Sequence, residues 1–221
     1  DCQSTYCDVT SRQCSESSCN DGIRDGEETD VDCGGSRCTA CAVGAQCTGA
    51  SDCKSQTCAA NRCINTYSVS ASVMGLRPAD RLTLQNNGKD ALSVSANGSY
   101  TFSTKVSGAY SVSIWEQPST SNCLLTNASG TASQNVSNIV VSCSPTYALG
   151  GTLTGLAAGQ MVRLLNGSDT VTLLQDGLCA FSQRISGSYA VTIQQQPGIG
   201  SCQVAGGSGT ASGDVGTVTV T

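Results

Sequence analysis

The sequence predicts a mainly β protein, in which a small disulfide-rich N-terminal region precedes two tandem antiparallel β-sandwiches. Two observations support this fold class. Eleven of the fifteen cysteines lie at or before Cys63. Beyond it, short runs of alternating apolar and small polar residues are separated by Gly, Asn, Pro and Asp, which is typical of strands and turns. The predicted domains are residues 1–64, 65–145 and 146–221.

The N-terminal region is predicted to be held together by disulfides. A segment of about sixty residues with few large apolar side chains cannot bury enough surface to fold around a core, and small secreted domains use covalent cross-links instead. So many thiols would be reactive in a reducing cytosol unless a metal bound them. We therefore expect a secreted protein, in an extracellular or periplasmic compartment.

The same region contains a repeat. Residues 1–7 (DCQSTYC), followed by Cys14, have the pattern of residues 52–58 (DCKSQTC), followed by Cys63. The chain thus opens partway through a unit, because the counterpart of Cys47 would precede residue 1. We expect the full gene product to be longer.

The second half contains two copies of one module. Residues 67–143 align with residues 147–221 at a near-constant offset. The counterpart of Cys143 would be residue 222, so we expect the sequence to continue beyond Thr221. Matching stretches are Gly75-Leu76 with Gly155-Leu156, residues 97–102 with 176–181, residues 107–112 with 186–191, Gln117-Pro118 with Gln196-Pro197, and residues 131–133 with 210–212.

Seven strands are predicted in the first copy, and the second copy repeats the layout. They fall near residues 67–74, 81–85, 91–95, 99–104, 109–115, 122–126 and 137–143. Asn97-Gly98 favours a tight hairpin turn. Seven short strands without a helical period indicate a sandwich. The expected core side chains are Tyr100, Phe102, Tyr110, Val112 and Ile114.

Residues 19–35 (CNDGIRDGEETDVDCGG), closed by Cys38 and Cys41, strongly resemble a cysteine-rich repeat of large secreted and surface proteins of bacteria. Residues 42–63 resemble the unit that commonly follows it. The resemblance covers about residues 1–63, and it implies an extracellular location, a modular architecture and no known catalytic activity. The second half resembles, more loosely, the Ig-like repeats of bacterial surface proteins, which implies two Ig-like β-sandwiches.

The acidic loop at residues 21–32 is the place where ligand chemistry is predicted. It holds six carboxylates in twelve residues, and Ca²⁺ prefers such clusters of oxygen ligands. The spacing is not that of an EF-hand. The alternative is a solvated loop in which Asn and Asp form turns. The proposed calcium ligands are Asp21, Asp25, Glu28, Asp30 and Asp32.

Cys38 and Cys41 form a CxxC, and with Cys19 and Cys33 they offer four thiols for a zinc site. Two disulfides are favoured instead. The chain has no histidine, and the many other cysteines indicate an oxidising compartment.

Disulfide pairing is predicted from the hypothesis that the repeated unit, Cys47 to Cys63 and its partial copy Cys2 to Cys14, joins its first cysteine to its third and its second to its fourth. Cys7 is then left over, either unpaired or in an intermolecular bridge, and a partner missing upstream is the favoured explanation. The predicted pairs are Cys2–Cys14, Cys47–Cys58, Cys53–Cys63, Cys123–Cys143 and Cys179–Cys202, with two bridges among Cys19, Cys33, Cys38 and Cys41.

Composition argues against several function classes. A formal net charge of −5 with eleven Lys plus Arg lacks the basic patch that nucleic acid requires. No run approaches the roughly 18 apolar residues that span a bilayer. Without histidine, Ser–His or Cys–His nucleophile activation is impossible, and the acids of the second half are too scattered for a glycosidase pair. We expect no enzymatic activity.

The leading functional prediction is an extracellular structural or adhesive protein, a stalk or self-assembling filament subunit at the bacterial surface. Residues 215–221 read as a strand that a neighbouring subunit's sheet edge could accept. The alternative is a carbohydrate- or ligand-binding module appended to a larger secreted enzyme, with Trp115 as an exposed anchor. We expect Trp115 in a core or at a contact between modules instead, since Trp is highly buried on average.

Overall fold

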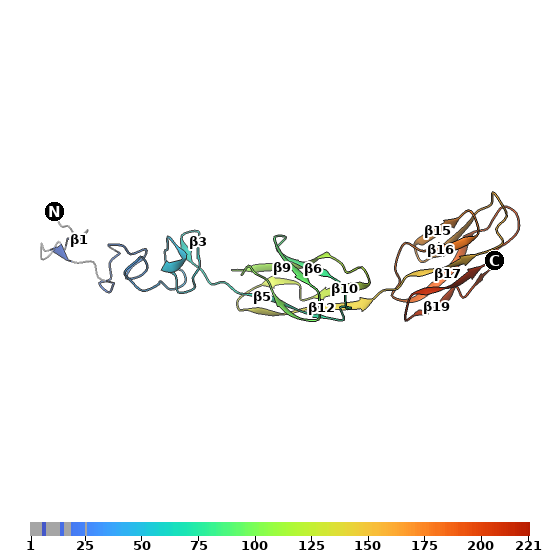
Figure 1. Cartoon of the computed structure of the whole chain (residues 1–221). Helices are drawn as coiled ribbons and strands as arrows, with labels where there is room; N and C mark the ends of the chain where they lie inside the picture. The colour runs from blue at the N-terminus through green and yellow to red at the C-terminus, as the bar shows by residue number, and fades with distance from the viewer. Residues whose placement is uncertain (1–5, 8–13, 16–18, 25) are drawn as a thin grey trace. The chain divides into compact units, whose positions relative to one another are not determined.

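The computed structural model describes residues 6–7, 14–15, 19–24 and 26–221 (Figure 1). In this described part the chain forms twenty strands, β1 to β20, and one short 3-10 helix, η1, at Ala50–Asp52. The prediction of a mainly β fold is therefore confirmed. Among the same residues, no helix is long and apolar enough to cross a bilayer.

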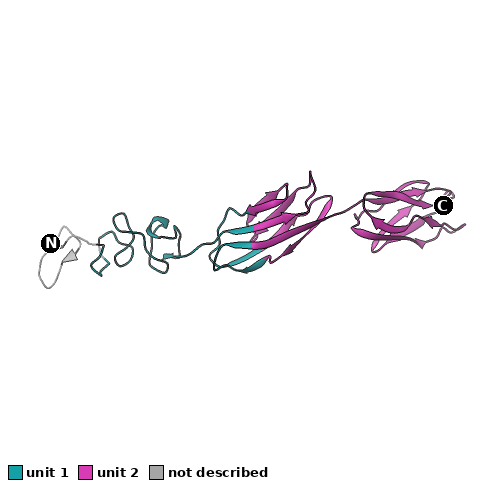
Figure 2. Cartoon of the chain, turned by 90° about the horizontal axis from the view of Figure 1, so that it is seen from below, with its two compact units in different colours: residues 1–70, 101–111, 129–137 teal, residues 71–100, 112–128, 138–221 magenta. Residues whose placement is uncertain are grey.

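The chain divides into two compact units (Figure 2). The first comprises residues 1–70, 101–111 and 129–137, and the second comprises residues 71–100, 112–128 and 138–221. The predicted domain limits near residues 64 and 145 do not coincide with these units, and they stay predictions.

The cysteine-rich region contains two short antiparallel ladders with related register. β1 (Tyr6–Cys7) pairs with β2 (Cys14–Ser15), and β3 (Cys58–Ala59) pairs with β4 (Arg62–Cys63). Cys7 lies opposite Cys14, as Cys58 lies opposite Cys63, which agrees with the sequence repeat. The predicted Cys2–Cys14 bridge involves Cys2, which is outside the described residues.

Disulfides and buried sulfur hold residues 19–63 together. The buried residues that form the cluster here are Cys41, Cys47, Cys53 and Cys63. The pairing in residues 47–63 follows the predicted pattern of first with third and second with fourth, and the cysteines of residues 19–41, whose pairing the sequence leaves open, adopt the same pattern. The bridges are Cys19–Cys38, Cys33–Cys41, Cys47–Cys58 and Cys53–Cys63.

The first module consists of strands β5 to β12, in two four-stranded sheets with the orders β10-β12-β5-β8 and β11-β9-β6-β7. All seven predicted strands have a counterpart, and β11 is an eighth. Of the expected core residues, Phe102, Tyr110 and Val112 are buried, while Tyr100 and Ile114 are half-buried. The strands are β5 (Val69–Met74), β6 (Leu82–Asn86), β7 (Asp90–Val94), β8 (Gly98–Thr101), β9 (Ala109–Glu116), β10 (Ser121–Thr126), β11 (Ser129–Thr131) and β12 (Val136–Pro145).

The second module repeats this order as β16-β13-β20-β18 and β15-β14-β17-β19. Its core draws on both sheets, with Leu149 and Val218 from one and Leu164 and Val191 from the other. The strands are β13 (Leu149–Leu153), β14 (Val162–Asn166), β15 (Asp169–Leu173), β16 (Gly177–Ala180), β17 (Gly187–Gln195), β18 (Val204–Ala205), β19 (Ser208–Ala211) and β20 (Val215–Val220).

Two features of β20 correct the predictions. It pairs with β13 in parallel, so the sandwich is not wholly antiparallel. The two backbones approach so closely that a Cβ on Gly151 would lie 1.8 Å from the Val218 carbonyl oxygen, which requires glycine at this position. β20 also lies between β13 and β18 within its own sheet. The C-terminal strand is therefore already paired on both sides and is not free to join a neighbouring subunit.

Matching residues of the two modules make the same hydrogen bonds. Gln117 Oε1 accepts from the amide of Cys123 at 2.9 Å, and Gln196 Oε1 accepts from the amide of Cys202 at 2.8 Å. In the same way, Asn97 and its counterpart Asp176 accept from backbone amides of the turn that follows the first strand of their module. The repeat in the sequence thus preserves side chains that satisfy turn amides, which would otherwise be left unpaired.

The predicted Cys179–Cys202 bridge is wrong, since both cysteines are free and buried. Cys179 lies on β16 and Cys202 precedes β18, and these strands form opposite edges of one sheet. Three strand spacings separate them by about 14 Å, twice the Cα separation of about 7 Å that a disulfide can bridge. In the first module, Cys123 and Cys143 face each other on neighbouring strands β10 and β12 and are bonded.

This difference makes the modules respond differently to reduction. Replacing Cys123 and Cys143 together by alanine is expected to lower the free energy of unfolding of the first module by about 3 kcal/mol, because the bridge closes a loop of about 20 residues. Urea unfolding followed by circular dichroism measures the loss. Replacing Cys179 and Cys202 by alanine serves as the control, because these cysteines are free and no bridge is lost. If dithiothreitol destabilised both modules equally, the assignment of a disulfide to the first module alone would be contradicted.

Candidate functional site

The acidic loop uses its carboxylates to bind its own backbone. Asp32 Oδ1 accepts hydrogen bonds from the amides of Asp21 and Gly22, each at 2.9 Å. Asp21 Oδ1 accepts from the amide of Ile23, also at 2.9 Å. Asp32 itself has φ of 57°, a left-handed conformation that Asp tolerates better than most residues. These two predicted calcium ligands therefore close turns of the loop.

The carboxylates of Glu28 and Asp30 also accept hydrogen bonds from backbone amides. Glu28 is buried, and its Oε2 accepts from the amide of Asp32 at 3.1 Å. Asp30 accepts from the amide of Gln46 at 2.6 Å and from that of Val31 at 2.8 Å. These bonds lower the pKa of Asp30 below its usual value, with the Gln46 bond contributing most. Asp30 thus ties the acidic loop to the following cysteine unit.

The geometry does not gather the predicted calcium ligands into one coordination shell. Within the described residues, two groups bring three ligand atoms within 4.8 Å of one another, and both consist mainly of cysteines, Cys47/Cys53/Cys63 and Cys19/Glu28/Cys38. Their sulfurs are bonded to each other or to further cysteines, so the alternative of a zinc thiolate site does not fit. Asp25 falls outside the described residues. Calcium binding stays a prediction.

Asp52 is a buried carboxylate of the cysteine-rich region that accepts several hydrogen bonds. Its side chain is 4% exposed and accepts from the amides of Thr48 at 2.8 Å, Gly49 at 2.9 Å and Gly35 at 3.0 Å, and from the Thr48 hydroxyl. The amide bonds from Thr48 and Gly49 contribute most to lowering the pKa of Asp52 to about 2. Asp52 therefore joins the two cysteine units as an ionised acceptor.

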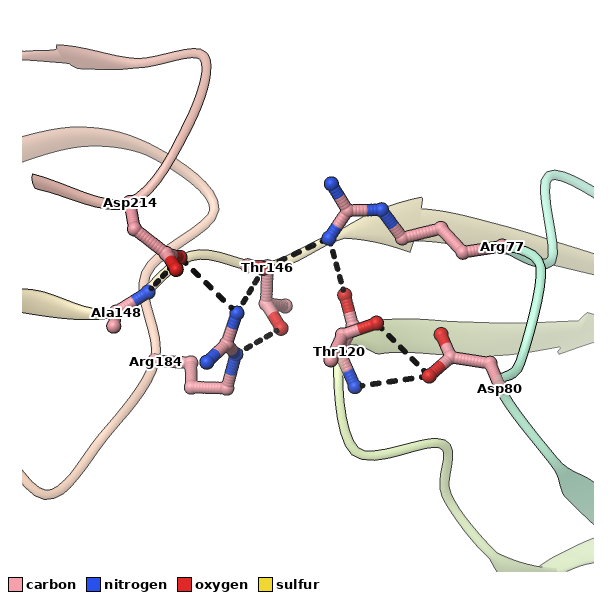
Figure 3. Close-up of polar contacts among 7 residues, drawn as sticks. All are labelled: Arg77, Asp80, Thr120, Thr146, Ala148, Arg184 and Asp214. Atoms are coloured by element: carbon pink, nitrogen blue, oxygen red, sulfur yellow. Dashed lines mark hydrogen bonds and ion pairs between the residues drawn. The ribbon is translucent and has the colours of Figure 1, made fainter.

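A second polar cluster surrounds Thr146, the residue between β12 and the start of the second module (Figure 3). Arg77, in the turn after β5, donates to the carbonyl oxygens of Thr120 and Thr146 at 3.4 Å each. Its guanidinium also lies 5.2 Å from the centre of the Tyr147 ring, a cation–π distance. The first module thus holds the linker through one arginine.

The second module contributes another arginine to the same residue. Arg184 donates to the Thr146 carbonyl oxygen at 2.8 Å and to its hydroxyl at 3.1 Å (Figure 3). It also forms an ion pair of 3.4 Å with Asp214, which accepts from the amide of Ala148 at 2.8 Å. Two guanidinium groups, one from each module, therefore share one backbone carbonyl.

Asp80 supports the first half of this linker cluster. It is buried and accepts from Thr120 at 2.9 Å and from the Ser121 hydroxyl at 2.6 Å. Burial alone would raise the pKa of Asp80, but the hydroxyls of Ser121 and Thr120, the Thr120 amide and nearby Arg77 outweigh it and lower the pKa. The carboxylate is ionised at neutral pH and positions Thr120 beneath Arg77.

The sequence predictions did not include the linker cluster. A signal for it does exist in the repeat. Arg77 and Asp80 of the first module align with Ala157 and Gln160 of the second. The charged pair therefore occurs in the first copy and is absent from the second.

Trp115 is 70% exposed, so the expectation that it lies in a core or at a contact is wrong. It occupies a β-bulge in β9, where the pairing with β6 shifts between Thr83–Glu116 and Leu84–Ile114. The buried and half-buried residues of this strand, Val112 and Ile114, point to the other face. The only tryptophan of the chain stands on the outer surface of its sheet.

Comparisons with known proteins add little to this geometry. No protein-family model and no curated protein matches the chain. Among solved structures, the Bacillus anthracis TIE protein matches with a TM-score of 0.28 and 11% identity over 72% of this chain and 35% of its own. The major pilin protein T-13 of Streptococcus pyogenes serotype GAS131465 matches with a TM-score of 0.22 and 11% identity, over 70% and 94%. This chain thus spans about a third of the TIE protein structure.

The Asp52 hydrogen bonds give a testable dependence on pH. The folded pKa of about 2 lies below the ordinary 3.8, so the stabilisation is complete above pH 3.8 and is lost as the pH falls toward 2.

In Asp52→Asn, amide exchange at Thr48 and Gly49 is expected to accelerate about tenfold at pH 7, since buried donors lose a charged acceptor. Hydrogen exchange measured by NMR tests this, with the exposed Asp21→Asn as control. Unchanged exchange would show that Asp52 does not hold the two units.

Proposed function

We propose that this chain is a non-catalytic structural or adhesive protein of the bacterial cell surface, and that it forms part of a stalk or a self-assembling filament. The observation that carries the proposal is the linker cluster. Thr146 accepts from Arg77 of the first module and from Arg184 of the second. An extended surface protein needs tandem modules whose connections resist bending, and a linker fixed from both sides supplies this.

Covalent cross-links support an extracellular role. Five disulfides occur in the described residues, and such bonds persist in oxidising compartments. Four of them cross-link residues 19–63, a segment with very little apolar core. A segment held by bonds rather than by burial tolerates proteases and exposure to changing solvents. The resemblance of residues 19–35 to a cysteine-rich repeat of bacterial surface proteins fits the same proposal.

The state of the buried acids supports a non-catalytic role. Asp52, Asp80 and Asp169 are buried and accept several hydrogen bonds, and each has a lowered pKa. For Asp169, the amide of Gln183 at 2.7 Å is the main cause. General acid catalysis near neutral pH requires a carboxyl whose pKa is raised instead. These three carboxylates serve as structural acceptors.

Electron microscopy of native material from the cell surface tests the proposal. Regular filaments or stalks that fit a repeating unit of this chain would support it. Isolated particles that retain an attached catalytic domain would contradict it. Repeating the measurement after reduction and after chelation asks separately whether disulfides or calcium maintain the assembly.

The calcium prediction has its own test at the acidic loop. A cation bound by the carboxylates of Asp21 and Asp32 would share those groups with the amides of Gly22 and Ile23 and weaken or displace their hydrogen bonds. Calcium addition would then change the amide resonances of those two residues. Unchanged resonances at millimolar calcium would leave the loop as a set of hydrogen-bonded turns.

The second candidate is a carbohydrate-binding module, and the exposure of Trp115 is the observation that favours it. An exposed aromatic face can stack on a sugar ring. Retention on polysaccharide that Trp115→Ala abolishes would support this alternative. A glycan array with no specific binding would count against it.

The linker cluster makes a prediction about flexibility. In the double variant Arg77→Ala, Arg184→Ala, the two modules are expected to tumble more independently, because each lost hydrogen bond removes about 1 kcal/mol of stabilisation. NMR relaxation of each module measures this. Arg163→Ala is the control, since that exposed arginine contacts Thr172 within one sheet. Identical relaxation in the wild type and the double variant would show that the arginines do not stiffen the linker.

A further inference from the structure

Part of one face of the second module is apolar where the first module is polar. The face belongs to β16, β13 and β20, on the side away from the core. At five aligned positions the first module carries serine or threonine and the second carries alanine, glycine or leucine, whereas Thr152 and Thr219 keep the rest of this face polar. The pairs are Ser68 with Ala148, Ser70 with Gly150, Ser99 with Leu178, Thr101 with Ala180, and Ser137 with Gly216.

The substitutions leave a groove on this face. It has a volume of about 310 Å³ and is lined by Ala148, Gly150, Leu178, Ala180 and Gly216, among others. In the first module, the corresponding hydroxyls of Ser70 and Thr101 are hydrogen-bonded at 2.8 Å, so the equivalent surface is filled and polar.

The rim of the groove is exposed apolar surface. Leu178 is 86% exposed, although leucine in a strand is usually placed against a core. Asp214, the acidic residue of the lining, is paired with Arg184 at 3.4 Å. The groove therefore offers apolar contact with its one charge already partnered.

The first module carries a matching feature that the second lacks. Trp115 is 70% exposed at the bulge of β9. The second module has the same bulge in β17, where β14 pairing shifts between Arg163–Gln195 and Leu164–Ile193. Its bulge residue is Gln194. The exposed Trp115 and this apolar groove thus lie in different modules.

We propose that Trp115 of one molecule inserts into the groove over Gly150 and Gly216 of a second copy of this chain. This inference rests on the proposed self-assembling function and names its contact. The groove has room for one indole ring, and buried tryptophans dominate the energetics of interfaces. Made head-to-tail, this contact builds an open filament when it does not close into a ring, whereas a reciprocal exchange of Trp115 between two copies would end at a dimer. Strand donation is not needed, since β20 is already paired on both sides.

Concentration series of the whole chain test the contact. Sedimentation velocity is recorded together with tryptophan emission, which reports Trp115 alone. We expect the mass to rise with concentration and the emission to shift to shorter wavelength in parallel, as the indole leaves water.

Variants on both sides of the contact sharpen the test. Trp115→Ala and Leu178→Ser are each expected to weaken self-association by about tenfold or more. Gly216→Ser restores the serine of the first module, and its Cβ meets nothing within 4 Å in the isolated chain, so folding is preserved while the groove is filled. Leu124→Ser is the control, since it removes another leucine, 66% exposed, from the first module.

Four results would overturn the inference. The first is a chain that stays monomeric with unshifted emission at every concentration. The second is self-association that leaves the emission unchanged, or that Leu124→Ser weakens as much as Leu178→Ser. The third is an emission shift on adding oligosaccharide without any change in mass, which would assign Trp115 to sugar binding. Native filaments that persist with Trp115→Ala would refute this contact and leave the proposed structural function standing.

Discussion

The constraint on which the cysteine-rich region depends is covalent closure of short loops. Four bridges in its described part span sequence separations of 8 to 19 residues, and each lowers the entropy of the unfolded chain by the equivalent of about 3 kcal/mol. The regular ladders described in this region are only two residues long on each strand, so other amides need acceptors outside a ladder. Asp30, Asp32 and Asp52 accept those amides instead. The acidic composition of the region thus follows from its cross-linking, because turns without strands need side-chain acceptors.

The residues of the two modules fall into two groups. Some match between the copies and stabilise the fold, and others differ between the copies. Gln117 and Gln196 close the same bend before the same strand, and Asn135 and Asp214 accept from equivalent amides at the entry to each module. These side chains are repeated because the backbone turns require them. The surfaces carry no such requirement, and they are where the two copies differ.

Alternation of apolar residues was sufficient to locate seven strands of the first module. It could not locate a strand without apolar residues, and it does not determine which strands pair. β11 (Ser129–Thr131) has no apolar residue and pairs with β9 alone. Strand partners are not encoded in alternation either, so neither the parallel β13–β20 pair nor the separation of Cys179 from Cys202 could be predicted. For Trp115, the inward-facing Val112 and Ile114 already predict a side chain on the outer face of the sheet. The average burial of tryptophan was a poorer predictor of its position. In the acidic loop, composition indicated oxygen ligands, but the turns decide where each carboxylate points.

Divergence between the copies gives the chain a direction. A module repeated without change would present the same surfaces twice, and two molecules could meet in several equivalent ways. Here the charged pair Arg77 and Asp80 occurs in the first module, and its counterparts Ala157 and Gln160 in the second are neutral. Trp115 likewise stands only in the first module, and the groove over Gly216 only in the second. The proposed contact would therefore join unlike surfaces. Head-to-tail contacts between unlike surfaces build open filaments when they do not close into rings, so divergence between the copies is what would allow directional growth of the proposed filament.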